Sequence, residues 1–348
     1  MLIVLPSLPV SKVQQFPSCI SLNTSFTKDR FMVNVEFGVK TGQGGYSYDD
    51  LRKVWTAAED LGYDSAWLYD HFYALGNKND QCLEGWTTLA ALASETKRLK
   101  IGTMVTSVSY RQPSLLAKMA TTVDIISKGR MILGIGAGWY EEEYRAYGYE
   151  YPDQATRVRQ LKEALIVIRK LWTEERATFK GKFYSTHEAI NMPKPVQKPS
   201  PKILIGITRG KKTLPYLAVR FADGFNLVAG SVEECAAILE SIRNYCLKFG
   251  KNLENLISSW QGFIMIGQSE SELNKIIEAS ARERGQSIAE FRKTAEERHF
   301  IIGKPEQCLE KLRRFKDIGI NHFILIFSDD TSLRPLGVFR DHVIPELK

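Results

Sequence analysis

The chain has 348 residues, of which 44% are hydrophobic and 25% charged, and its formal net charge is +7. This composition is that of a globular protein, and the lack of a long apolar run or a basic, aromatic-interleaved motif argues against membrane and nucleic-acid partners. Five widely spaced cysteines without a C-x-x-C pair argue against a zinc site and a disulfide framework, and they fit reduced thiols in the cytoplasm.

Residues 1–31 differ from the rest of the chain, because they are rich in Ser, Pro and Thr and show no hydrophobic periodicity. We predict a disordered extension, or a start codon assigned too early, with Met32 as the true start. A secretory signal is disfavoured, since the apolar start lacks a basic region and is interrupted by Pro6 and Pro9. Residues 32–348 are predicted to form a single domain.

From Val33 onward, short apolar runs typical of strands alternate with longer amphipathic patterns typical of helices. The first part predicts strands at 33–39, 65–70, 99–105 and 130–136, and helices at 48–62, 87–96, 114–127 and 154–172. Residues 174–202 break the alternation, and four prolines within 192–202 exclude a regular element there. The second part predicts strands at 203–207, 224–228, 256–267 and 322–327, and helices at 213–222, 232–249, 270–298 (two stretches), 305–318 and 333–346.

The eight predicted strands are near-continuous apolar runs, as expected for parallel strands that are covered on both faces. Each of them is followed by at least one helix. The pattern therefore predicts an α/β fold, a (β/α)8 TIM barrel with an insertion between units four and five. An open, doubly wound sheet is the alternative.

In a (β/α)8 barrel the active groups follow the C-terminal ends of the strands, so candidate residues are expected at those positions. The second strand ends in "YDHFY", which places Asp70 and His71 at the rim. A histidine beside a carboxylate can donate or accept a proton near neutral pH. The same two residues are also compatible with a purely structural loop, in which Asp70 caps a turn. No second His or Cys at ligand spacing indicates a metal.

Three glycines at alternate positions, Gly134, Gly136 and Gly138, stand at the end of the fourth predicted strand and just after it. A dinucleotide fingerprint has the spacing G-x-G-x-x-G and follows the first strand of a sheet, so this motif does not predict a NAD site. It predicts either a tight turn or a loop whose backbone approaches an anion. The fifth strand ends in "IGITRGKK", where Arg209 and two lysines mark a second candidate anion site or a solvated basic turn.

Taken together, several segments resemble the luciferase-like monooxygenase superfamily, and more narrowly its branch of oxidoreductases that use the deazaflavin coenzyme F420. These segments are "WLYDHF", "LEGWTTLAALA", "GTMVTSVSYRQPSLLAKMATTVDIISKGR", "LGIGAGWYEEEYRAYG", "LWTEE", "PKPVQKP" and "RFADGFN". The resemblance covers about Val33 to Glu346 in order. It implies a (β/α)8 barrel with an insertion after the fourth unit, a flavin or deazaflavin in the barrel mouth, and a homodimer.

The resemblance also implies where the cofactor lies. Asp70 and His71 correspond to the pair that lies against the ring system, and Met104-Val105 corresponds to a non-proline cis peptide bond that supports the ring. The glycine turn would line the polar side of the cofactor, and its phosphate would lie near the end of the fifth strand. The cofactor-binding residues are then Met104, Val105, Thr106, Gly136, Ala137, Gly138, Gly206, Ile207, Thr208 and Arg209.

We expect hydride transfer between F420 and a small organic substrate, with His71 as proton donor or acceptor and Asp70 fixing its tautomer. The alternatives are an FMN-dependent monooxygenase that receives reduced flavin from a partner reductase and activates O₂, and a non-catalytic flavin-binding protein. Candidate walls of the substrate pocket are Tyr46, Glu84, Tyr110 and Trp139, whose aromatic members are also compatible with simple packing of loops over the barrel.

Two departures from the family pattern bear on the reaction and the cofactor. Members that oxidise sugar phosphates carry a glutamate just after the glycine turn, where this chain has Trp139. That reaction is therefore disfavoured. Many relatives have a glycine-rich loop after the fifth strand, where this chain has Ile207-Thr208-Arg209, which leaves the phosphate contact and the choice between F420 and FMN open.

Overall fold

The computed structural model describes residues 34–75 and 77–348, so the predicted extension and the first residue of the first predicted strand lie outside the described residues. Eight strands form the centre of the molecule. They are β1 (Glu36–Lys40), β2 (Ser65–Leu68), β3 (Lys100–Ser107), β4 (Met131–Gly136), β7 (Lys202–Ile207), β8 (Gly224–Val228), β9 (Ile257–Ile266) and β11 (His322–Phe327).

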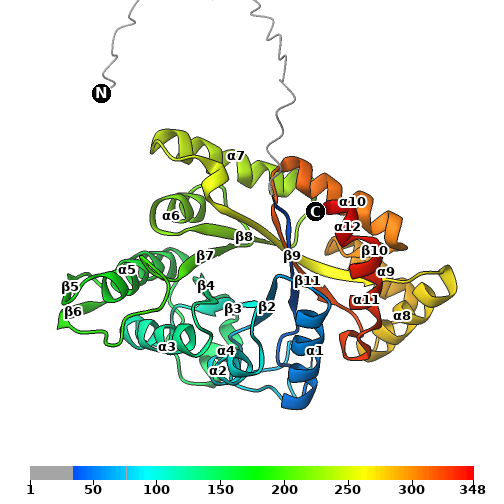
Figure 1. The fold of residues 1–348 in the computed structure, drawn as a ribbon, viewed down its shortest axis with the longest axis horizontal. Helices are drawn as coiled ribbons and strands as arrows, with labels where there is room; N and C mark the ends of the chain where they lie inside the picture. The colour runs from blue at the N-terminus through cyan, green and yellow to red at the C-terminus, as the bar shows by residue number, and fades with distance from the viewer. Residues whose placement is uncertain (1–33, 76) are drawn as a thin grey trace, which may run out of the picture. The chain divides into compact units, whose positions relative to one another are not determined.

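Helices follow these strands and surround them (Figure 1). They are α1 (Tyr48–Asp60), α2 (Gly85–Glu95), α3 (Pro113–Ile126), α4 (Glu141–Ala146), α5 (Gln154–Thr173), α6 (Thr213–Phe221), α7 (Val232–Lys248), α8 (Glu270–Glu283), α9 (Ile288–Glu297), α10 (Pro305–Ile318), α11 (Arg334–His342) and α12 (Ile344–Leu347). Two 3₁₀ turns, Leu253–Asn255 and Asp330–Ser332, complete the connections.

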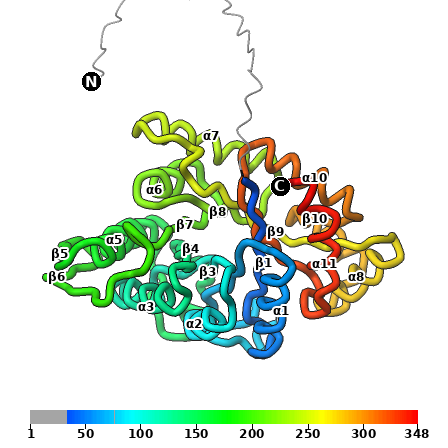
Figure 2. The backbone as a smooth tube through the Cα atoms, viewed as in Figure 1, coloured from blue at the N-terminus to red at the C-terminus, as the bar shows by residue number. Residues whose placement is uncertain are grey.

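The central strands are parallel, and they close on themselves in the order β9-β11-β1-β2-β3-β4-β7-β8, because β8 pairs with β9. Figure 2 shows the first and last strands, β1 and β11, meeting beside β9 at the centre of the molecule, far apart in sequence but adjacent in space. The predicted (β/α)8 barrel is therefore confirmed, and the open sheet is excluded. Because all eight strands run in one direction, their C-terminal ends share one mouth.

Four short elements, three strands and the helix α4, were not predicted from the sequence. The antiparallel hairpin β5 (Ala177–Lys180) and β6 (Ser185–Ala189) lies within the segment that breaks the alternation, and Figure 1 shows it at one edge of the molecule. Strand β10 (Ile301–Gly303) extends the sheet beside β9, and α4 follows the glycine turn. The predicted closing helix is interrupted between α11 and α12, where Pro345 occupies the first turn of the new helix.

Side chains alternate along each strand between the helix layer and the barrel interior. Along β1, Phe37 packs on Phe339 of α11, whereas Gly38 faces the interior, where an added Cβ would meet Ser65 and Trp67. The interior core consists of Trp67, Met104, Ile132, Leu204 and Ile324. Below it, His322 lies 2.8 Å from the Ser65 hydroxyl, and burial lowers the pKa of His322 to about 3, so the base of the barrel is uncharged there.

Candidate active site

His71 lies at the mouth, just after β2, and its partner is a residue that the sequence did not single out. Its Nδ1 is 2.8 Å from a carboxylate oxygen of Glu143 in α4, a side chain with no exposed surface. The other Glu143 oxygen accepts the backbone N–H groups of Phe72 and Tyr73, at 2.5 and 2.9 Å. Burial opposes ionisation of Glu143, but its hydrogen bonds from His71 and Tyr110 outweigh burial and hold the pKa of Glu143 below its ordinary value.

Asp70 does not pair with His71, which corrects the expectation that it fixes the histidine tautomer. Successive residues of an extended chain point in opposite directions, so these neighbours face different groups. Asp70 accepts two hydrogen bonds from the Arg111 guanidinium, at 2.6 and 2.9 Å, and a third from the backbone N–H of Ser107 at 3.0 Å. Asp70 therefore anchors the loop after β3, while Glu143 holds the imidazole.

Aromatic rings surround the histidine. Trp139 contacts the His71 ring edge-on with the centroids 5.6 Å apart, and it is 62% exposed, so it forms an outer wall of the mouth. Tyr69 and Tyr140 contact the same ring at 5.3 and 6.0 Å. Tyr110, by contrast, is buried, and its hydroxyl donates a hydrogen bond to Glu143. It therefore stabilises the His71–Glu143 pair and does not form an exposed wall of the mouth.

The end of β3 carries the expected cis bond and lies on two glycines. The Met104–Val105 peptide bond is cis, as the resemblance implies. The Val105 side chain lies where a Cβ at Gly136 or Gly206 would come within 2.8 and 3.0 Å of it. Thr106, fully buried, hydrogen-bonds Thr103 at 2.6 Å and fixes the turn from below. A larger residue at either glycine would displace Val105.

The glycine turn after β4 is tightly packed. Gly138 has a φ of +79°, and a Cβ there would come within 1.9 Å of the Tyr144 hydroxyl and 2.8 Å of the Ser107 hydroxyl. Glycine is required at this position on both counts. Ala137 is partly exposed beside it. This packing fits the tight turn, and the approach of a ligand to this backbone stays a prediction.

The loop after β7 is basic and unpaired. Ile207 is buried at the end of the strand, whereas Thr208 and Arg209 are exposed. Arg209, Lys211 and Lys212 make no hydrogen bond or ion pair with the part of the chain that the structure describes. The loop precedes α6, whose N-terminus has no side-chain cap. Free backbone N–H groups and unpaired cations together can hold a phosphate.

The remaining two predicted pocket residues have structural partners. The Tyr46 hydroxyl donates to Asp330 at 2.6 Å and links the loops after β1 and β11, and burial raises the pKa of Asp330 to about 6. Glu84 caps the N-terminus of α2 by accepting from the backbone N–H groups of Trp86 and Thr87, at 3.1 and 2.6 Å. A Glu84 carboxylate oxygen also lies 3.5 Å from the Arg111 guanidinium, so Glu84 lies beside the Asp70–Arg111 ion pair.

Lys40, the last residue of β1, is a second functional candidate that the sequence alone did not single out. It is 8% exposed, and its ammonium donates to Gln261 Oε1 on β9 at 3.2 Å. No carboxylate within the described residues pairs with it. Burial lowers the pKa of Lys40 from its ordinary 10.5 to about 7. The sequence did offer one signal for a buried lysine. Lys40 ends an apolar strand, and it stands two residues after Gly38, so both residues face the barrel interior.

The buried amine should make the stability depend on pH. Because the pKa of Lys40 is lower in the folded than in the unfolded chain, the unfolded chain binds more protons between pH 7 and 10.5. The free energy of unfolding should therefore rise with pH across this window, by about 1.4 kcal/mol per pH unit at most. Urea unfolding of wild type and Lys40→Met at pH 7, 8 and 9 measures this, since the variant lacks the slope. A constant difference between the two proteins across these pH values would contradict the prediction.

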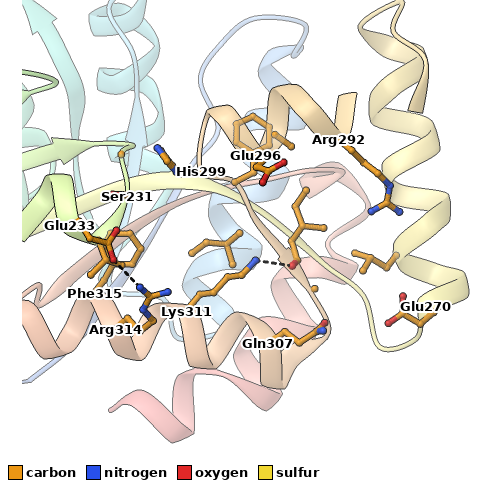
Figure 3. Close-up of a pocket in the computed structure, with 18 residues that line it drawn as sticks. Ser231, Glu233, Glu270, Arg292, Glu296, His299, Gln307, Lys311, Arg314 and Phe315 are labelled. Carbon is orange, nitrogen blue, oxygen red and sulfur yellow. Dashed lines mark hydrogen bonds and ion pairs between the residues drawn. The ribbon is translucent and has the colours of Figure 1, made fainter. Parts of the chain in front are cut away.

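A hollow lies away from the barrel mouth, lined by residues of α7, α8, α9, α10 and β10 (Figure 3). Its volume is about 690 Å³. Arg314 pairs with Glu233 at 2.9 Å, and Lys311 donates to the Ile302 carbonyl at 3.2 Å, as Figure 3 shows. Because these charged groups already have partners, the hollow does not present the convergent chemistry found at the mouth.

Residues 34–75 and 77–348 contain no group of three or more His, Cys, Asp or Glu side chains that could hold a metal ion. None of the helices in these ranges has the length and apolar character needed to cross a bilayer.

Comparison with known proteins finds relatives along nearly the whole chain. An F420-dependent glucose-6-phosphate dehydrogenase from Amycolatopsis mediterranei is 24% identical over 334 residues, which cover 90% of this chain and 99% of the relative. The protein of the same name from Intrasporangium calvum is 27% identical over 317 residues, which cover 84% of this chain and 92% of the relative.

Solved structures share the fold. An F420-dependent secondary alcohol dehydrogenase, in complex with an F420–acetone adduct, superposes with a TM-score of 0.77 at 22% identity, covering 90% of this chain and 99% of that one. The oxygenating component of the FMN-bound 3,6-diketocamphane monooxygenase from Pseudomonas putida superposes with a TM-score of 0.72 at 17% identity, covering 90% and 98%. The model of the luciferase-like monooxygenase family matches residues 30–322. The chain therefore belongs to the luciferase-like monooxygenase family.

Proposed function

We propose that the protein is an F420-dependent oxidoreductase that transfers a hydride between the deazaflavin and a small organic substrate. The observation that carries the proposal is the position of His71 at the barrel mouth, with Nδ1 held by the buried Glu143. No described residue contacts its Nε2 through a hydrogen bond, so this nitrogen is available to a ligand. The names of the F420-dependent relatives support the same choice of cofactor.

The residues at the mouth fit a ring with a phosphate-bearing tail. Gly136 and Gly206 accommodate the Val105 side chain, which a Cβ at either position would displace. Arg209 and the two lysines after it supply unpaired positive charge at the end of β7. We propose that the ring lies on Val105 and that the phosphate lies against the basic loop. When bound, a deazaflavin supplies two-electron hydride chemistry.

The role that we propose for His71 follows from its hydrogen bond. A carboxylate on Nδ1 keeps the proton of the neutral imidazole on that nitrogen and stabilises the imidazolium when Nε2 is protonated. Nε2 can then accept a proton from a substrate hydroxyl during oxidation, or return it to an oxygen during reduction. Trp139 and the neighbouring tyrosines exclude water from one side of this nitrogen.

The substrate that we propose is not a sugar phosphate. Trp139 lies where sugar-phosphate members of the family carry an acid, and an indole cannot donate a proton to a reacting oxygen. Its exposed face, together with Tyr140 stacked on it at 5.0 Å, offers an apolar and aromatic wall. A substrate with an apolar body and one hydroxyl or carbonyl group fits such a wall and the single nitrogen of His71.

The rival function is an FMN-dependent monooxygenase that receives reduced flavin from a partner reductase. The luciferase-like monooxygenase family and the FMN-bound structural neighbour support this alternative. The decisive experiment is equilibrium binding of F420 and of FMN to the purified chain, followed by quenching of ligand fluorescence. We expect F420 to bind at micromolar concentration or below and FMN to bind at least tenfold more weakly. The reverse preference, with O₂ consumed in the presence of reduced FMN, would replace the proposal by the monooxygenase. Tight binding without any turnover would favour a non-catalytic flavin-binding protein.

Two further expectations accompany this proposal. We propose that residues 32–348 form one domain and that two copies of the chain associate as a homodimer. Sedimentation of the full chain and of a chain that begins at Met32 tests both, since the shorter chain should remain folded and dimeric.

A further inference from the structure

Lys40 and Gln261 form a hydrogen-bonded pair deep in the mouth, and both keep N–H groups that no described residue accepts. Gln261 Oε1 accepts from the Lys40 ammonium at 3.2 Å, so this bond uses the acceptor oxygen of the amide. Among the described residues, no acceptor takes a hydrogen bond from the Gln261 NH₂ group, and the bond to Gln261 is the one hydrogen bond that the Lys40 ammonium donates. Both side chains are 8% exposed, so neither amine nor amide is fully solvated.

The pair lies in the barrel interior rather than under the helices. Lys40 and Gln261 come from β1 and β9, which are separated by β11 in the sheet order, so their side chains meet across the inside of the barrel. Layers inside such a barrel are built from alternate strands. Val105 on β3 and Gly206 on β7 supply the other two positions of this layer, and they contact each other. One layer of the barrel interior therefore contains both Val105, on which we propose that the ring lies, and the Lys40–Gln261 pair.

The absence of a carboxylate partner is the unusual property of this lysine. A buried ammonium is costly unless a partner compensates its charge, and Gln261 is uncharged. An acceptor oxygen or nitrogen with negative character, supplied by a ligand, would complete the site. The pyrimidinedione edge of a flavin or deazaflavin ring carries such carbonyl oxygens.

We propose that Lys40 and Gln261 form a cationic donor pair that binds the carbonyl-bearing edge of the cofactor ring. The inference rests on the proposed function, because it needs a ring over Val105. Lys40 holds the edge by a charge-assisted hydrogen bond, and Gln261 both positions the lysine and donates a second hydrogen bond. The pair thereby fixes how far the ring enters the barrel and how it is oriented toward His71.

The test compares dissociation constants of F420 for the wild-type chain and for Lys40→Met, Lys40→Arg and Gln261→Leu. A hydrogen bond to a charged group contributes about 1.5–3 kcal/mol, so Lys40→Met should weaken binding roughly 10- to 100-fold. Gln261→Leu should weaken it about three- to tenfold, and Lys40→Arg should lose less than Lys40→Met. Lys97→Met is the matched control, because Lys97 is exposed and lies just before β3, outside the proposed donor pair.

A second ligand separates contact with the ring from contact with the tail. A ligand that consists of the deazaflavin ring and its ribityl chain, without the phosphate, should bind Lys40→Met more weakly than wild type. The factor by which its affinity falls should equal the factor for F420. The absorption band of the bound ring should also shift in this variant and not in Lys97→Met, since a charge next to the ring changes its transition energy. Circular dichroism and thermal unfolding confirm that each variant is folded.

The outcomes are distinct. Unchanged F420 binding by folded Lys40→Met, or a loss limited to the phosphate-bearing ligand, would overturn the donor pair and leave the proposed function intact. If the wild-type chain binds neither F420 nor FMN, the proposed function fails and the inference fails with it. If Lys40→Met does not fold, the comparison of Lys40→Arg and Gln261→Leu decides, since binding equal to wild type in both would exclude the contact.

Discussion

Replacing His71 with alanine should lower the rate of F420-coupled turnover roughly 10²- to 10⁴-fold, the usual contribution of a positioned general acid or base. The loss should fall on kcat, because Nε2 reaches the substrate and Glu143 takes the other nitrogen. Cofactor affinity should change by only a few-fold, since the ring would rest on Val105 and the basic loop. Steady-state kinetics on the substrate found by screening, with fluorescence binding in parallel, measures both quantities.

His187→Ala is the matched control for this experiment, because His187 is an exposed residue of the β6 strand. It should leave turnover and binding unchanged. Glu143→Gln adds a second test, since a neutral amide stabilises the imidazolium less well, and the acid limb of the pH–rate profile should move. A loss of less than threefold in His71→Ala, with the cofactor still bound, would remove His71 from the chemistry.

Replacing Arg111 with methionine should destabilise the fold by about 3–5 kcal/mol, because it leaves a buried carboxylate without its partner. The Asp70 side chain is 1% exposed and the Arg111 side chain 10% exposed, and two hydrogen bonds join them. Burial opposes the charge of Arg111, but Asp70 outweighs it and raises the pKa of the guanidinium. Urea unfolding at pH 7 measures the change.

The double variant Asp70→Asn with Arg111→Met should recover part of the loss, because the uncompensated charge is then absent. Arg314→Met is the matched control, since Arg314 forms its ion pair with Glu233 on the surface, where the two side chains are 59% and 72% exposed. It should change stability far less. If Arg111→Met unfolds at the same urea concentration as Arg314→Met, the Asp70 anchor does not stabilise the fold.

The barrel was predictable because its strands are buried on both faces. Runs such as Ile203–Ile207 and Phe323–Phe327 are apolar throughout, and a helical pattern follows each of them, which identifies parallel strands without any tertiary information. The hairpin of β5 and β6 has mixed, largely exposed positions, so its sequence lacks this signal. Strand β10 has only three residues and exists because β9 offers an edge.

The site was predictable only in part. Position at the end of a strand identified His71, and resemblance located the cis bond at Met104–Val105, which the structure contains. The pairing of Asp70 with Arg111 was not predictable, because the two residues are 41 positions apart and meet only through the sheet. Lys40 escaped notice for the same reason, since its burial depends on the closure of the barrel through β9 and β11.

Glu143 is the last of three consecutive glutamates, and the fold gives the three different tasks. Glu141 and Glu142 are exposed and pair with Arg145 and Lys78 at the surface, whereas Glu143 gathers His71, Tyr110 and two backbone amides in the interior. The three glutamates look equivalent in the sequence, but neither of the first two can take over the contacts of Glu143. In a library of random variants, positions 141 and 142 should therefore accept many residue types, whereas position 143 should retain glutamate.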